Sequence, residues 1–88
     1  MFEWDEAKRL RTLRERYLDF RDAYLVFDGR PVIHVRARGN EEERFVSTAE
    51  VNGKLYTVVW TWRGENQRII SFRRARDGEE RAFNARFG

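Results

Sequence analysis

Arginines are the residues whose type and spacing could do chemistry in this sequence. The stretch from position 63 to 76 holds five of them and a single acidic residue, Glu65. The five are Arg63, Arg68, Arg73, Arg74 and Arg76. Arg presents a planar fork of N–H donors that suits phosphate or carboxylate, and it stays charged at any useful pH. RNA cleavage at a phosphodiester needs a base for the 2′-OH, a cation for the developing charge and an acid for the leaving oxygen. Arginine supplies the cation well and the acid badly.

Proton transfer would therefore fall to other side chains. The candidates are His34, Tyr17, Tyr24, Tyr56, Glu41, Glu42, Glu43 and Glu50. His34 lies in an apolar run, where a lone histidine is more often a packed or solvent-facing strand residue than a catalyst. Trp60 and Trp62 could stack bases, which contributes about 1–3 kcal/mol per base. Their spacing beside Tyr56 is more typical of sheet core.

Composition excludes several other kinds of site. Without cysteine there is no disulfide, thiolate nucleophile or thiolate metal site, and one histidine cannot form a zinc site. We therefore expect no metal and no cofactor. No apolar stretch approaches the roughly 20 residues of a membrane span. The start, Met1 to Glu6, is acidic and aromatic where a signal peptide would be basic and then apolar. These features predict a cytoplasmic protein with no membrane partner.

Size and charge point to one small domain with a polyanionic partner. The chain has 88 residues, which is enough for a single domain over 1–88 with one modest core. The net charge is +3, and all of that excess falls in residues 45–88, because residues 1–44 hold equal numbers of basic and acidic groups. RNA or DNA is the first partner to consider. An arginine-favouring proteome would explain the excess equally well.

The spacing of apolar residues predicts two helices near the N-terminus. The first runs from about residue 5 to 17, with Asp5 as N-cap. Its predicted apolar face consists of Ala7, Leu10, Leu13 and Tyr17. The second begins after Asp19 and ends at Asp28-Gly29. Its predicted apolar face consists of Phe20, Ala23, Tyr24 and Phe27.

The rest of the chain reads as four strands and a final helix. Val32, Ile33 and Val35 indicate a short strand, and 39–43 reads as a polar, acidic loop. Asn52-Gly53 is a strong hairpin signal joining Arg44–Val51 to Leu55–Arg63, and a turn at 64–66 leads into Gln67–Arg74. Both faces of the 55–63 strand are apolar, which predicts a central position. Asp77 and Glu80 form a predicted capping pair, and Phe83 and Phe87 mark the apolar face of the helix. The predicted class is α+β, with an antiparallel four-stranded sheet, two N-terminal helices and one C-terminal helix.

An ordered set of short motifs resembles the BrnT family over nearly the whole chain. The motifs are Phe2-Glu3-Trp4-Asp5 with Lys8; Phe20, Ala23 and Val26-Phe27; Glu43-Arg44-Phe45; Thr61-Trp62-Arg63-Gly64; and the stretch from Arg68 to Ala75 with Glu79. The resemblance implies a RelE-like ribonuclease toxin of a bacterial type II toxin–antitoxin pair. It also implies two partners: an RNA substrate, and a DNA-binding antitoxin, BrnA, in a heterotetramer. The sequence departs from the family pattern in two places, where Glu15-Arg16-Tyr17 replaces Lys-His-Gly and Phe83 replaces a tyrosine.

The resemblance and the arginine pattern together select the candidate site. The catalytic candidates are Arg63, Arg68, Arg73, Arg74, Glu43 and Tyr17, and the RNA-binding candidates are Lys8, Arg16, Arg44 and Arg76. In this reading the arginines bind and polarise the phosphate, while Glu43 or Tyr17 moves the proton. Two alternatives stay open at this point. One is a catalytically weakened homologue that binds an antitoxin or RNA, and the other is a plain nucleic-acid-binding module.

Overall fold

The second half of the chain forms a meander of three antiparallel strands. The computed structural model describes residues 1–37 and 42–88, and the meander consists of β3 (Arg44–Val51), β4 (Lys54–Arg63) and β5 (Asn66–Arg74). Asn52 and Gly53 have φ values of 53° and 79°, the left-handed conformation that a two-residue hairpin turn requires at both central positions. The hairpin prediction is confirmed. The predicted loop at 39–43 falls mostly on residues outside the described part.

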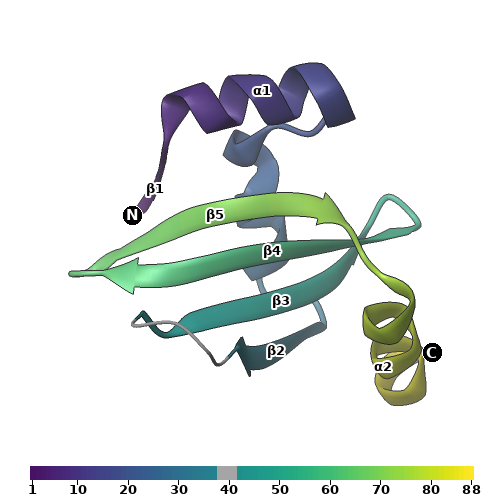
Figure 1. Cartoon of the computed structure of the whole chain (residues 1–88). Helices are drawn as coiled ribbons and strands as arrows, with labels where there is room; N and C mark the ends of the chain where they lie inside the picture. The colour runs from purple at the N-terminus through teal and green to yellow at the C-terminus, as the bar shows by residue number, and fades with distance from the viewer. Residues whose placement is uncertain (38–41) are drawn as a thin grey trace.

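Five strands form a mixed sheet in the order β1-β5-β4-β3-β2 (Figure 1). The α+β class and the central position of β4 are confirmed. The prediction of a four-stranded antiparallel sheet is wrong, because β1 (Phe2–Trp4) pairs in parallel with β5. Three residues are too few to show an alternating pattern, and the partner strand lies at the other end of the sequence. The second strand, β2 (Val32–Ala37), pairs with β3 and runs two residues beyond the predicted Val35.

The main core lies between the sheet and η1 (Phe20–Phe27), a 3-10 helix that lies behind the sheet in Figure 1. Phe20, Ala23 and Val26 are buried, and their intervals of three residues match the period of a 3-10 helix. The predicted α-helical face is therefore partly wrong, since Tyr24 is half exposed. Asp19 caps this helix as predicted, accepting a hydrogen bond from the backbone N–H of Arg21.

Helix α1 (Glu6–Arg16) has the predicted ends but not the predicted buried face. The Asp5 carboxylate accepts from the Lys8 backbone N–H at 3.1 Å, as the N-cap prediction requires. Leu10 and Tyr17 are exposed, whereas Arg9 is buried. The Arg9 guanidinium donates to Glu6 and to Asp19, so its burial is compensated by two ion pairs, of which the one with Asp19 also fastens α1 to the start of η1.

Helix α2 (Asp77–Phe87) packs at the end of the sheet where β5 stops (Figure 1). Phe83 is buried, as predicted, and Phe87 is partly exposed. The predicted Asp77–Glu80 capping pair is wrong. Glu79 performs that role instead: its carboxylate accepts from the Arg76 backbone N–H at 2.8 Å. No helix in the described residues combines the length and the apolar character needed to cross a bilayer.

Candidate nucleic-acid interface

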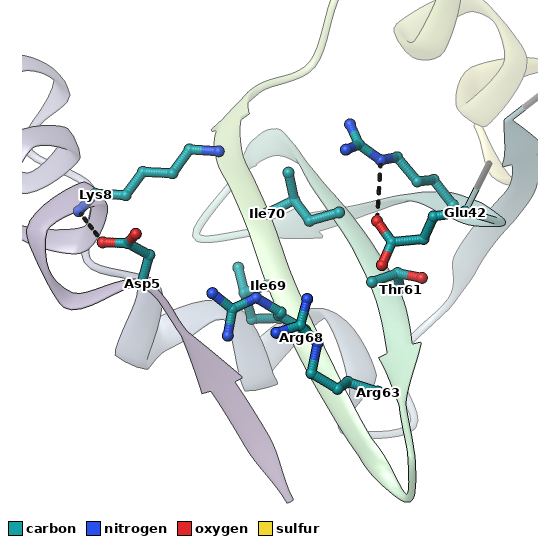
Figure 2. Close-up of a pocket in the computed structure, with 9 residues that line it drawn as sticks. Asp5, Lys8, Glu42, Thr61, Arg63, Arg68, Ile69 and Ile70 are labelled. Atoms are coloured by element: carbon teal, nitrogen blue, oxygen red, sulfur yellow. Dashed lines mark hydrogen bonds and ion pairs between the residues drawn. The ribbon is translucent and has the colours of Figure 1, made fainter. Parts of the chain in front are cut away.

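Four cationic side chains from four different elements line one pocket of about 230 Å³. They are Lys8 of α1, Arg44 of β3, Arg63 of β4 and Arg68 of β5. Asp5, Glu42, Thr61, Ile69 and Ile70 complete the lining. Figure 2 shows Arg63 and Arg68 close together near the β4–β5 turn, and Lys8 reaching from α1 toward β5. Two of the four catalytic arginines and two of the four RNA-binding candidates meet here.

Sheet register explains why these residues converge. Thr61 pairs with Arg68 across β4 and β5, and Arg63 lies two residues further along the same face of β4. Lys8 reaches the pocket because the pairing of β1 with β5 fixes where α1 begins. The short strand that the sequence pattern did not predict therefore completes the site.

Arg68 is anchored by an ion pair across the β1–β5 junction. Its Nη1 lies 2.7 Å from the Glu3 Oε2 atom, and the Asn66 side-chain amide donates to the other Glu3 oxygen at 3.1 Å. Hydrogen bonding to Arg68 holds the pKa of Glu3 below its usual value, despite an opposing effect of burial. Glu3 is a site residue that the sequence reasoning missed. Its signal was present in the opening motif, but the contact requires the long-range strand pairing.

Lys8 and Arg44 make the pocket electropositive. Burial, followed by the positive charges of Arg44 and Arg11, lowers the pKa of Lys8. The Arg44 Nε atom is buried and has no hydrogen-bond partner among the described residues, since the nearest Glu42 oxygen is 3.8 Å away. A buried guanidinium N–H without a close acceptor is costly, and the Glu42 carboxylate, as the ion-pair partner of Arg44, offsets only part of that cost.

Arg73, Arg74 and Arg76 do not reach this pocket. Arg73 forms a bidentate pair with Glu79 at 2.7 and 2.9 Å, and only 15% of its side chain is exposed. Arg74 lies over the Tyr56 ring, and Arg76 precedes α2. Arg73 and Arg74 end β5 and Arg76 caps α2, so all three lie at the opposite end of β5 from the β4–β5 turn.

Tyr17, Arg16 and Glu43 also have their side chains outside the pocket lining. Tyr17 ends α1 in a left-handed conformation and is 87% exposed, with Arg16 exposed beside it. The Glu43 carboxylate pairs with Arg36 at 3.2 Å. Among the other proton-carrier candidates, Glu42 lines the pocket and Glu41 lies outside the described residues.

His34 and the two tryptophans lie in different environments. His34 Nδ1 lies 2.6 Å from the Ser47 Oγ atom, and its ring stacks on Phe27, so it is a satisfied strand residue. Trp60 is buried in the core and donates to Ser47. Trp62 is 52% exposed, so the expectation that both tryptophans belong to the core is wrong for Trp62.

Within residues 1–37 and 42–88, no group of three or more His, Cys, Asp or Glu side chains could hold a metal ion.

A comparison with protein-family models identifies the family of the chain. The search of curated proteins returns no match. The model of the ribonuclease toxin BrnT, of type II toxin–antitoxin systems, matches residues 4–79, which include all four cations of the pocket. The chain therefore belongs to the BrnT ribonuclease toxin family of type II toxin–antitoxin systems.

Proposed function

We propose that this chain is an endoribonuclease toxin that acts in the cytoplasm, cleaves RNA without a metal and blocks translation. The observation that carries the proposal is the convergence of Lys8, Arg44, Arg63 and Arg68 on one pocket. Clustered cations in a concave site stabilise the charge that develops on a phosphoryl group during transfer. Membership of a ribonuclease toxin family supports RNA as the substrate.

The pocket supports a specific division of roles. Arg63 and Arg68 donate to the non-bridging oxygens of the scissile phosphate, and the Arg44 guanidinium adds a third positive charge beside them. The Glu42 carboxylate accepts the proton of the 2′-OH as the bond from this oxygen to phosphorus forms. Lys8 gives its proton to the 5′-oxygen as that oxygen leaves. The products are a 2′,3′-cyclic phosphate and a free 5′-hydroxyl.

This assignment differs from the sequence-based site in two respects. The proposed proton carriers are Glu42 and Lys8 in place of Glu43 and Tyr17, because the side chains of Glu42 and Lys8 line the pocket. Lys8 suits an acid because its lowered pKa brings proton release closer to neutral pH. The arginines in contact with substrate reduce to Arg44, Arg63 and Arg68, since Arg73 is already paired with Glu79.

A cognate antitoxin is the second proposed partner. A type II toxin is neutralised by a protein, and a DNA-binding antitoxin of the BrnA kind, forming a heterotetramer with the toxin, is the expected form. Covering the basic pocket is the simplest route to silencing, because it removes the phosphate site from solvent.

The proposal is tested by inducing the chain alone in a bacterial host and following growth and total RNA. We expect growth arrest with RNA decay for the wild type, and a loss of both for Arg63→Gln. Loss of a transition-state cation commonly costs about 100- to 1000-fold in rate. Arg81→Gln is the matched control, since it removes the same charge from the exposed surface of α2. Equal toxicity of wild type and Arg63→Gln, both folded, would contradict the proposed site.

A binding-only role is the alternative outcome of the same experiment. The observation that favours it is the departure from the family pattern, because Arg16 and Tyr17 stand where the family has a histidine and a glycine, which removes a group that could carry a proton. Purified protein that binds RNA and leaves it intact, with normal growth on induction, would assign the chain to a weakened homologue or a nucleic-acid-binding module.

A further inference from the structure

Trp62 is a half-exposed aromatic side chain that directly precedes the pocket residue Arg63 in β4. It is 52% exposed, while Trp60, two residues earlier on the same face of β4, is 6% exposed. The two indole rings meet edge to face with centroids 5.2 Å apart, which fixes the Trp62 ring against the core. A rigid, half-exposed indole loses little conformational entropy when a second ring stacks on it.

Trp62 lies on β4 where the pairing with β3 has ended, while β5 and β1 still continue the sheet on the other side. The pairing of β3 with β4 ends at Phe45 and Trp60, so Trp62 and Arg63 lie beyond the start of β3. Figure 1 shows the tip of the β4–β5 hairpin projecting past β3. Consecutive residues of a strand point to opposite faces. Arg63 therefore faces the pocket and Trp62 faces the other side, and between them no strand of the part of the chain that the structure describes pairs with the β3-side edge of β4.

We propose that Trp62 is a stacking site for an unpaired base of the RNA, one that makes this chain select single-stranded over double-stranded RNA. The proposal rests on the proposed function and deepens it. A strand whose phosphate is held by Arg63 crosses the β3-side edge of β4, and the base of a neighbouring nucleotide lies against Trp62. Stacking on an aromatic ring is tolerant of sequence because every base has a π-face. In a duplex the bases are already stacked on one another and do not reach the indole.

The test uses RNA that binds without being cleaved, so that it does not depend on catalysis. The probes are short 2′-O-methyl oligonucleotides. One strand is complete, and each of the others has a single abasic position at a different place along the strand. We expect the wild type to bind the complete strand between about fivefold and about 150-fold more tightly than the best-placed abasic strand, the range that one stacked base contributes. A duplex of the same sequence should bind like the abasic strand.

Two variants separate stacking from structural loss. Trp62→Leu keeps an apolar side chain against Trp60 but has no π-face, and we expect it to bind complete and abasic strands equally. Trp62→Phe should restore most of the preference. Arg63→Gln is the matched control: it should weaken both strands by the same factor and leave their ratio unchanged. If Trp62→Leu still binds the complete strand more tightly than the abasic strand by the wild-type factor, the stacking site is wrong. If Arg63→Gln binds RNA as tightly as the wild type, the phosphate pocket is wrong.

Discussion

At the residue scale, Glu3 presents an apparent conflict, because it places a negative charge beside a pocket that should attract phosphate. Its carboxylate holds Arg68 at 2.7 Å and is itself held by Asn66. The pair leaves the other guanidinium donors of Arg68 able to face the pocket. Glu3 is thus a positioning residue, which lowers the net charge of the site while restricting where Arg68 can point.

Glu3→Gln should therefore separate substrate binding from catalysis. Removing the negative charge raises the attraction for phosphate, so KM for a short RNA should fall. Loss of the ion pair releases Arg68, and kcat should fall by about tenfold, which corresponds to about 1.4 kcal/mol of transition-state stabilisation. Steady-state cleavage assays measure both constants. Glu65→Gln removes a charge from the exposed β4–β5 turn and serves as the control. An unchanged kcat would show that Arg68 needs no anchor.

At the element scale, the attachment of α2 depends on a polar contact as well as on Phe83. The Glu79 carboxylate accepts hydrogen bonds from Arg73, from the Thr57 hydroxyl and from the Arg76 backbone. Hydrogen bonding to Arg73 lowers the pKa of Glu79 from an ordinary value of 4.5 to about 2, against the opposing effect of burial. One carboxylate thus joins β4, β5 and the start of α2.

The lowered pKa of Glu79 predicts acid sensitivity with a definite sign. A carboxyl group whose pKa is lower in the folded state stabilises the fold fully above its unfolded pKa, near 4.5, and loses this contribution as the pH falls toward about 2. The pair is partly exposed, so solvent screening limits the contribution to about 1 kcal/mol. At pH 3 a little over half of this contribution is lost, so between pH 6 and pH 3 the Tm of Glu79→Gln should fall less than that of the wild type, by about 2–5 °C. Thermal unfolding followed by circular dichroism measures the difference, and Arg73→Gln should behave alike. Parallel curves for wild type and Glu79→Gln would rule out this contact as the source.

The elements also show which parts of the fold can be predicted from a single sequence. The hairpin was predictable because Asn52 and Gly53 encode the turn locally, through the φ values that they tolerate. The strand β1 was not, because its pairing with β5 depends on residues at opposite ends of the chain. The buried face of α1 was misread for a related reason. Arg9 is buried only because Asp19, ten positions away, joins Glu6 in compensating its charge.

The sequence likewise predicted some residues of the candidate site and could not predict others. Arginine spacing identified Arg63 and Arg68, because both belong to adjacent strands joined by a short turn. It could not separate them from Arg73, whose partner Glu79 lies in the following helix. Lys8 came from the resemblance to a family, and the contact that brings it to the pocket runs through β1.

At the scale of the whole molecule, the charge could act on RNA in two ways. The net charge of +3 could attract the polyanion without regard to position, or the four pocket cations could make discrete phosphate contacts. The two cases differ in the effect of removing one charge. A diffuse field responds equally to the loss of any arginine, whereas discrete contacts respond only to the loss of one that touches phosphate.

The salt dependence of RNA binding distinguishes these cases. Each phosphate contact on single-stranded RNA adds about 0.7 to the slope of log affinity against log salt, so four contacts predict a slope of about −3. Arg63→Gln should make that slope shallower by about 0.7, and Arg81→Gln should leave it unchanged. Fluorescence anisotropy with an uncleavable 2′-O-methyl strand over a range of salt concentrations gives all three slopes. If both variants shift the slope equally, binding depends on the overall charge of the protein, and the pocket is not the site of discrete phosphate contacts. If only Arg63→Gln does, the contacts are local, and the convergence of four elements on one pocket is the physical basis of RNA recognition.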